Sequence, residues 1–322
     1  MATYVRLRYL LQTTDPVHIG TGGYRLGRVD NAIVRDPGTR LPKIPGTSLH
    51  GAIRAYAAYL YGTPAAAGQK HDAVEKPDEN PICYTFGYIK KQKANDSNEG
   101  EEVMAYSGVV NIFDAHILLF PVYSMVGPIW VSTAQRLKEA GFSVNLSGSS
   151  LSQEGVFLTW ERKNPLNLGW LMLPSAGRVE INAPEVWSSE PWNVVKDRLA
   201  LVSDALFSQI VNSNLEVRTS VSIDPETGAA EEGALFTYEA IPRATFLTME
   251  AIIDDYRGNF PKDDSKKWSS PADVLTAGLC LIEWLGVGGM GTRGFGRIAL
   301  VGRPKEQNFE TLQSQYHEQL TR

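Results

Sequence analysis

Two short segments near opposite ends of the chain constrain its fold most strongly. Residues 41–54 read Leu-Pro-Lys-Ile-Pro-Gly-Thr-Ser-Leu-His-Gly-Ala-Ile-Arg, and residues 286–296 read Gly-Val-Gly-Gly-Met-Gly-Thr-Arg-Gly-Phe-Gly. The first predicts a helix over 46–62 that begins directly after a proline, and the second predicts a glycine-rich loop between two apolar stretches. Free backbone amides at a helix start suit a phosphate group, and glycines let a backbone approach one closely. We therefore expect the two segments to hold an extended polyanion such as RNA.

Neither segment matches a common nucleotide-binding motif. A P-loop requires GxxxxGK[ST] in one piece, and dinucleotide folds require GxGxxG directly after a strand. The net charge of −5 also argues against a generic, sequence-blind nucleic-acid binder, because the whole protein does not attract phosphate. RNA would therefore have to lie in a local basic groove.

The composition is that of a globular chain that stays in the cytoplasm. Its 322 residues suffice for one large domain or two small ones. Cys83 and Cys280 have no CxxC spacing, so we expect neither structural zinc nor a disulfide framework, and a reducing compartment fits. No run of about 18 apolar residues could cross a membrane, and the first residues alternate like a strand and do not resemble a signal peptide. We expect no membrane partner.

Apolar periodicity and turn residues predict mixed α and β structure along the chain. Residues 63–101 are polar and charge-mixed, which is typical of an insertion, and the polar tail from residue 305 is expected to fray. We predict strands at 3–13, 29–35, 109–123 and 297–302, helices at 46–62, 192–212 and 272–285, and a β-hairpin formed by 216–224 and 233–241 around the turn at 224–228.

Five segments together resemble a known family. Ile-Pro-Gly-Thr-Ser-Leu-x-Gly-Ala-Ile-Arg at 44–54 and Gly-Gly-Met-Gly-Thr-Arg-Gly-Phe-Gly-Arg at 288–297 look like signatures of the RAMP superfamily of CRISPR RNA-binding proteins. Three further segments, in this order and spacing, resemble the repeated backbone subunits of type III-B, or Cmr, effector complexes: residues 15–22 running into 28–36, residues 113–124, and residues 222–230 leading to 238–243. One departure is His50, where the superfamily usually has a lysine.

The resemblance implies both a fold and a function. It implies an α+β, ferredoxin-like (RRM-like) palm within a single RAMP domain over 1–322, with an insertion at about 63–105 and a protruding thumb hairpin at about 216–243. It implies a subunit that binds guide RNA along its phosphates and acts as an endoribonuclease on the paired target RNA, with specificity supplied by base pairing. The implied partners are guide RNA, target RNA, further copies of the chain in a helical filament, and other subunits of the complex.

Cleavage is expected to depend on the loop at 18–30. The resemblance places at Asp30 the aspartate on which target cleavage depends. A single carboxylate could hold a hydrated Mg²⁺ or Mn²⁺ beside the phosphate, or it could orient or deprotonate a 2′-hydroxyl. It does not build a two-metal site, so RNA self-cleavage assisted by a loosely held metal is favoured. His18 could be a phosphate contact, an acid–base partner or a structural histidine. The resemblance also implies that the thumb hairpin wedges into the guide–target duplex, and Tyr238 with Glu239, at the returning base of this hairpin, could face the phosphate that is distorted there.

The remaining candidates are predicted RNA contacts. Arg54 has an alternative as a residue at the edge of the core, because it points to another side of the helix than Ser48. His50, as a neutral imidazole, would contribute less than a lysine. Glycine-rich turns also close β-structures that bind nothing. The predicted contacts are Arg28, Lys43, Gly46, Thr47, Ser48, His50, Arg54, Gly288, Gly289, Arg293 and Gly294.

Several alternatives remain open from the sequence. The hairpin could be a plain exposed β-arm, and the loop at 18–30 a plain surface loop. Phe113, Asp114 and His116 are expected in the core, with a satisfied polar pair. At the level of function, the chain could be a non-catalytic scaffold that binds guide RNA, or a metal-independent ribonuclease that processes guide RNA.

Overall fold

The structure, a computed structural model, describes residues 3–22, 29–68, 73–92, 102–146, 155–262 and 268–320. Its centre is a large mixed sheet with the strand order β17-β1-β16-β6-β7-β13-β9-β12-β8, to which β18, β2 and β5 add at β1, β6 and β16. The strands of this sheet are β1 (Thr3–Thr13), β2 (Lys43–Ile44), β5 (Val110–Ile112), β6 (Ala115–Ser124), β7 (Gly127–Ser132), β8 (Ser143–Leu146), β9 (Val156–Leu158), β12 (Ser175–Asn182), β13 (Leu199–Leu201), β16 (Phe246–Asp255), β17 (Ile298–Leu300) and β18 (Lys305–Asn308).

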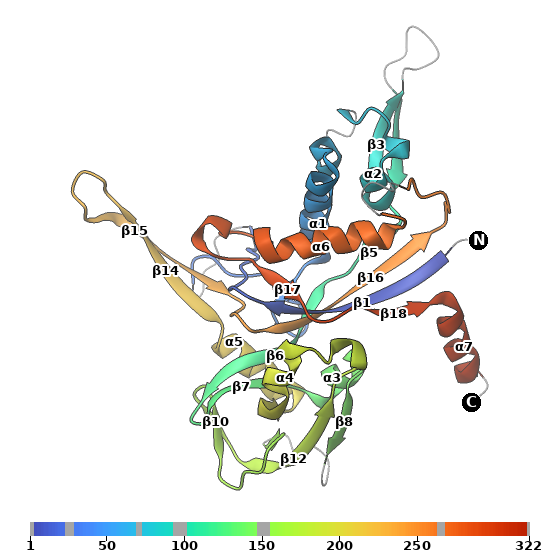
Figure 1. Cartoon of the computed structure of the whole chain (residues 1–322). Helices are drawn as coiled ribbons and strands as arrows, with labels where there is room; N and C mark the ends of the chain where they lie inside the picture. Colours follow the sequence, from blue (N-terminus) through green and yellow to red (C-terminus); the bar gives the residue numbers. More distant parts are fainter. Residues whose placement is uncertain are drawn as a thin grey trace.

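Helices cover both sides of this sheet (Figure 1), and three hairpins form separate two-stranded sheets. Helices α1 and α6 lie on one side, and α3, α4 and α5 belong to the lobe on the other. The hairpins pair β3 (Gly87–Gln92) with β4 (Glu102–Ser107), β10 (Leu166–Leu168) with β11 (Leu171–Leu173), and β14 (Glu216–Ile223) with β15 (Ala230–Ala240). The helices are α1 (Gly46–Tyr61), α2 (Pro81–Phe86), α3 (Ala134–Ala140), α4 (Glu190–Val195), α5 (Asp204–Ser213), α6 (Pro271–Leu285) and α7 (Phe309–Leu320), with short 3₁₀ turns η1 (Pro64–Ala67), η3 (Pro77–Glu79), η4 (Glu185–Trp187), η5 (Lys196–Arg198) and η6 (Gly291–Arg293).

The alternation of β1 divides the core between the two sides of the sheet. Leu7, Tyr9 and Leu11 point to the core shared with α1 and α6, whereas Leu10 belongs to a second core that contains Trp187. Local sequence signals fix one end of each long helix over the first core. Helix α1 ends where Gly62 takes a left-handed conformation, and α6 begins with a capping box formed by Ser270 and Asp273.

Several predicted elements are confirmed, and two are wrong. The strand at 3–13, the helices at 46–62 and 272–285, and the hairpin strands all form close to their expected bounds. The predicted helix at 192–212 is instead α4, η5, β13 and α5, because the apolar run that begins at Leu199 forms a wholly buried strand between β7 and β9. Residues 29–35 form isolated bridges to Gly20, Pro42 and Tyr238 in place of a strand.

The tail from residue 305 does not fray. Strand β18 pairs with β1, and α7 follows it, with Phe309 packed 5.6 Å from the ring of Tyr4. This packing is a long-range contact that the polar sequence of the tail does not reveal.

Part of the predicted insertion lies in the core. Every residue of α2 is buried, and the side chain of Asn80 caps this helix by accepting hydrogen bonds from the amides of Ile82 and Cys83. Residues 69–72 and 93–101 of the insertion lie outside the described residues. The division of the chain into one domain with an insertion and a thumb stays a prediction. None of the described helices is long and apolar enough to cross a membrane.

Candidate functional site

The start of α1 and the glycine-rich loop at 286–296 meet in one pocket of about 370 Å³. Helix α1 contributes Ser48, Ala52 and Tyr56, and the glycine-rich loop contributes residues between 285 and 295. The Tyr56 hydroxyl donates a 2.6 Å hydrogen bond to the carbonyl of Gly286, which joins the two elements directly. Thr47 is exposed and Ser48 is half-buried, so both face the surface beside this pocket.

The start of α1 already holds an anion from the protein itself. The Gly46 amide donates to Oδ1 of Asp114 at 2.7 Å, and the Lys43 ammonium lies 2.7 Å from Oδ2. Burial raises the pKa of the Asp114 carboxyl, but the hydrogen bonds from Lys43 and Gly46 outweigh it and leave this pKa below its usual value. Gly46 is required for packing, because a Cβ there would collide with the carbonyl of Ile112. These contacts correct the expectation that Lys43 and Gly46 are free for phosphate.

The polar pair expected within residues 113–116 is therefore formed differently. Asp114 pairs with Lys43 across the β2–β6 bridge, whereas the ring of Phe113 is 47% exposed and His116 is exposed as well. The prediction of a buried cluster is wrong at these two positions.

Arg54 lies inside the protein, which corrects its assignment as an RNA contact. Its side chain is 9% exposed. The guanidinium donates to the carbonyls of Ala66 at 2.7 Å and Gly87 at 2.9 Å, and more weakly to that of Phe86 at 3.4 Å. It thereby ties α1 to η1 and to the junction of α2 and β3. We assign Arg54 a structural role.

His50 packs half-buried against the same region. Its ring lies 5.2 Å from that of Phe86 in an edge arrangement. Burial, followed by the charge of Arg54, lowers the pKa of His50, so the imidazole is neutral at pH 7. Its contribution to RNA binding stays a prediction.

Within the glycine-rich loop, some glycines serve packing and others face solvent. Gly288 has φ +90°, and a Cβ there would lie 2.5 Å from the carbonyl oxygen of His18. The Gly289 amide donates to that same oxygen at 2.9 Å. Gly294, at φ +81°, has open space around it, and Arg293 is exposed, with its guanidinium carbon 5.4 Å from the ring centroid of Phe236 in β15. Arg293 is thus a cation at the surface of this loop, at the root of the β14–β15 hairpin.

Asp30 lies at the same hairpin root and is exposed. Its Oδ2 accepts hydrogen bonds from the backbone amide of Thr237 at 2.7 Å and from the Thr237 hydroxyl at 2.9 Å. These bonds hold the pKa of the Asp30 carboxyl below its usual value, so the group is ionised throughout the neutral range. An anion of this kind is better suited to holding a cation than to removing a proton.

The other three predicted catalytic residues are buried beneath Asp30. Glu239 is 7% exposed and binds Arg35 through both oxygens, at 2.8 and 2.6 Å. His18 is 5% exposed and donates from Nδ1 to the Glu239 carbonyl at 2.6 Å. Tyr238 packs 5.4 Å from the ring of Phe295. These contacts favour the structural alternative for His18 and leave the catalytic role of all three a prediction.

The hairpin face above Asp30 becomes apolar one pair beyond Thr237. Thr237 pairs with Thr219, and the next pair along the same face is Val221 with Leu235. Val221 is 41% exposed and Leu235 is 65% exposed. Asp30 therefore lies at the foot of an exposed apolar face. Arg28, the remaining predicted RNA contact, lies outside the described residues.

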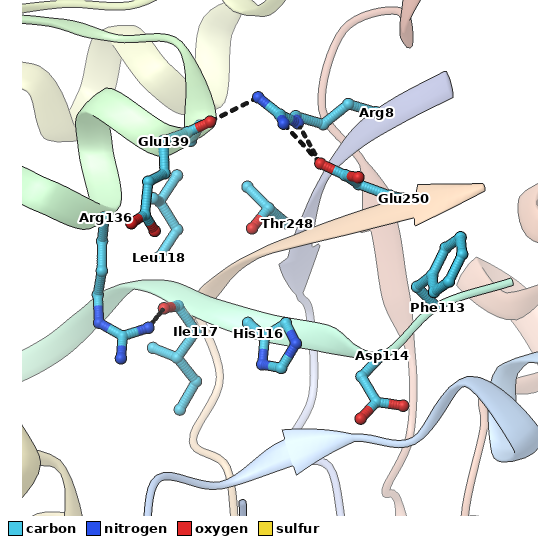
Figure 2. Close-up of a pocket in the computed structure, with 11 residues that line it drawn as sticks. Arg8, Phe113, Asp114, His116, Ile117, Leu118, Arg136, Glu139, Thr248 and Glu250 are labelled. Atoms are coloured by element: carbon cyan, nitrogen blue, oxygen red, sulfur yellow. Dashed lines mark hydrogen bonds and ion pairs between the residues drawn. The ribbon is translucent and has the colours of Figure 1, made fainter. Parts of the chain in front are cut away.

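A second cavity, of about 460 Å³, lies between β6, β16 and α3. Figure 2 shows Arg8 directed at the carboxylate of Glu250 and at the carbonyl of Glu139, with bonds of 2.7 and 2.6 Å. Arg6 binds the same carboxylate at 2.7 Å. Arg8 is thus engaged by Glu250, and Asp114 and Glu139 add two further carboxylates to the lining, which makes this cavity a weaker candidate for RNA than the hairpin root.

A model of the RAMP superfamily matches residues 10–299. The chain belongs to the RAMP superfamily. A related protein is the CRISPR system Cmr endoribonuclease Cmr4 of Pyrococcus furiosus, which is 28% identical over 256 residues that cover 74% of this chain and 78% of that protein. The CRISPR system Cms endoribonuclease Csm3 of Enterococcus italicus is 35% identical over 93 residues, or 28% of this chain and 41% of that protein.

Solved structures share the fold of this RAMP protein. A type III-B Cmr-beta complex bound to cognate target RNA contains a chain that matches with a TM-score of 0.58 and 16% identity, over 93% of this chain and 96% of that one. Oligomeric Cmr4 of Pyrococcus furiosus matches with a TM-score of 0.52 and 20% identity, over 96% and 98%.

The sequence did not indicate the roles of Thr237 and Arg35, and it did not indicate the partners of Asp114. Thr237 holds Asp30, Arg35 binds Glu239, and Asp114 occupies the start of α1. A signal existed for Thr237, because it lies two residues before Glu239 and so on the same face of the predicted strand. In the described part of this RAMP protein, no group of three or more His, Cys, Asp or Glu residues could hold a metal ion.

Proposed function

We propose that this chain is the repeated backbone subunit of a type III-B effector complex, which binds guide RNA and cleaves the complementary target RNA. The observation that carries this proposal is the position of Asp30, an exposed and ionised carboxylate fixed to the root of an apolar hairpin. The relation to Cmr4 and Csm3, both of which are named endoribonucleases, supports it.

We also propose that the central part of this subunit, the palm, has a ferredoxin-like core. Strands β17, β1, β16 and β6 are neighbours in that order, and α1 follows β1 while α6 links β16 to β17. Such a split β-α-β arrangement is the one that a ferredoxin-like core requires. The β14–β15 hairpin, which projects away from the palm in Figure 1, would be the thumb.

Guide RNA would follow the surface beside the pocket between α1 and the glycine-rich loop. The side chains of Thr47, Ser48 and Arg293 remain available there, because they are not occupied by the internal contacts that engage Lys43, Gly46 and Arg54, and Gly294 leaves open space beside Arg293. A guanidinium together with hydroxyl donors suits phosphate oxygens. Contacts of this kind do not read sequence, so specificity would come from base pairing.

The thumb would separate bases of the guide–target duplex. The exposed side chains of Val221 and Leu235 offer an apolar wedge, and apolar wedges unstack base steps at a cost of roughly a few kcal/mol. Distortion at that step would bring a target phosphate close to Asp30 at the foot of the wedge.

The cleavage step would be an attack within the target strand. The 2′-hydroxyl oxygen forms a bond to the adjacent phosphorus and loses its proton to solvent, and the bond from phosphorus to the 5′ oxygen breaks. The leaving oxygen takes a proton, so the products carry a 2′,3′-cyclic phosphate and a 5′-hydroxyl. Asp30, being ionised, would recruit the cation by its charge and fix its position beside the phosphate. Bound Mg²⁺ or Mn²⁺ would stabilise the charge that develops on the phosphate, with water and phosphate as further ligands.

Cleavage by a reconstituted complex tests this proposal. With guide RNA and the other subunits present, complementary RNA should be cut at regular intervals, EDTA should stop cutting, and a non-complementary RNA should survive. Cutting that is unchanged in Asp30→Ala would leave the chain as a non-catalytic scaffold. Maturation of repeat RNA by the isolated protein in EDTA would instead support a guide-processing ribonuclease.

A further inference from the structure

The carboxylate of Asp30 has a defined orientation because of one residue. Two donors of Thr237, its amide and its hydroxyl, converge on Oδ2 at 2.7 and 2.9 Å. In return, the Asp30 amide donates to the Thr237 hydroxyl oxygen at 3.1 Å. The hydroxyl is thus fixed as acceptor and donor at once. Rotation of the carboxylate would break the bonds to Oδ2, so Oδ1 is the oxygen presented for other ligands.

The backbone around this contact is also tied to the hairpin. The Asn31 amide donates to the Thr237 carbonyl at 3.0 Å, and the Glu239 amide donates to the Asn31 carbonyl at 3.2 Å. Two residues further along β15, the buried Glu239 pairs with the half-buried Arg35 and continues these contacts. The Asp30 segment is therefore bonded to β15 through its backbone as well as through its side chain.

The root of β15 is itself held by packing against the glycine-rich loop. Tyr238 packs with Phe295 and Ala240 in a small separate core, against which Phe236 and Met290 also pack. Arg218 of β14 lies over the ring of Phe295 at 4.5 Å. The glycine-rich loop, the hairpin and Asp30 are thus linked by one continuous set of contacts.

We propose that Thr237 is the positioning residue for Asp30, so that the hairpin that separates the RNA bases also aims the carboxylate at the phosphate. This inference rests on the function proposed above. Thr237 acts through Asp30 and does not touch the reacting atoms. A misplacement of about 1 Å in a catalytic group can cost about 100-fold in rate. Because the Thr237 amide keeps one bond in any side-chain variant, we expect a loss of about tenfold when the hydroxyl is removed.

The chain offers a matched control for this contact. In the turn after residue 35, the amide and hydroxyl of Thr39 converge on Oδ1 of Asp36 at 2.9 and 3.1 Å. This is the same arrangement of threonine and aspartate, away from the hairpin. Thr39→Val removes the same kind of bond as Thr237→Val, with the same change in side-chain shape.

The experiment compares single-turnover cleavage rates and target-RNA dissociation constants in the complex assembled with guide RNA. Thr237→Val should cut about tenfold more slowly at the same positions and bind target RNA as wild type does. Thr237→Ser, which keeps the hydroxyl, should restore most of the rate, and Thr39→Val should match wild type. Asp30→Ala should abolish cutting.

Each other outcome contradicts a definite part of this reasoning. If Asp30→Ala is inactive while Thr237→Val cuts at the wild-type rate, or if Thr237→Ser is as slow as Thr237→Val, Thr237 does not position Asp30. A weaker affinity of Thr237→Val for target RNA, in proportion to its slower cutting, would mean that Thr237 only maintains the hairpin. Full activity of Asp30→Ala would overturn the proposed function itself, and a slow Thr39→Val would move the catalytic carboxylate to Asp36.

Discussion

Replacing Arg54 with alanine should destabilise the protein and leave its surface for RNA unchanged. The guanidinium donates to two buried carbonyls at 2.7 and 2.9 Å, those of Ala66 and Gly87. Each buried acceptor left without a partner costs about 1–3 kcal/mol, so we expect a loss of about 4 kcal/mol in the free energy of unfolding. At about 2–4 °C for each kcal/mol, the melting temperature should fall on the order of 10 °C.

The assay is thermal or denaturant unfolding of the purified protein, in parallel with binding of guide RNA. Arg293→Ala is the matched control, since it removes the same side chain from an exposed position. It should unfold within about 0.5 kcal/mol of wild type. It should also bind guide RNA more weakly, with a log–log salt slope lower by about one unit. If Arg54→Ala unfolded at the wild-type temperature and lost RNA affinity with a lower salt slope, Arg54 would be an RNA contact and the structural assignment would be refuted.

Three further predictions concern the charge of Asp114, the packing of the glycine-rich loop and the self-association of the chain. The pKa of Asp114 is lowered in the folded protein, so its stabilising effect is present above the unfolded pKa of about 4 and is lost as the pH falls through the folded value. Asp114→Asn should therefore cost about 1–2 kcal/mol at pH 7, and urea titrations at pH 7 and near pH 3 should show this difference shrinking in acid. Gly288→Ala should destabilise the chain by at least about 1 kcal/mol because of its φ of +90° and its contact with His18, whereas Gly291→Ala, which has open space, should unfold like wild type. The chain should associate head-to-tail into open oligomers that lengthen with guide RNA, and light scattering that found a closed dimer with and without RNA would contradict this.

Local signals were sufficient to predict much of the fold. Strand β1 has apolar residues at alternate positions from Val5 to Leu11, and α1 and α6 carry proline or capping residues at their starts. The prediction failed where long-range packing outweighs the local pattern. Strand β13 has only three residues, and its apolar sequence fits a helix as well as a strand. Strand β18 and helix α7 are held by contacts to β1, which the polar sequence of residues 305–320 does not predict.

The candidate site was predicted at the level of segments more than of side chains. The start of α1, the glycine-rich loop and Asp30 were all singled out, and the structure brings the first two together in one pocket. The sequence could not reveal that Asp114 would occupy the helix start, because the bridge of β2 to β6 that brings it to Lys43 joins residues far apart in the chain. The two alternatives for Arg54 were open for a similar reason, since the carbonyls that bind it come from the insertion.

The most direct test of the account is single-turnover cleavage of a bound target by complexes that contain Asp30→Asn. The amide keeps the shape of the carboxylate and is a much weaker ligand for a cation and a weaker base. We predict that this complex binds guide and target RNA at least as tightly as wild type, because a negative charge beside phosphate is removed, and that the regularly spaced cuts with 2′,3′-cyclic phosphate and 5′-hydroxyl ends disappear. Cutting at the wild-type rate by Asp30→Asn, or wild-type products that carry a 5′-phosphate, would contradict the account.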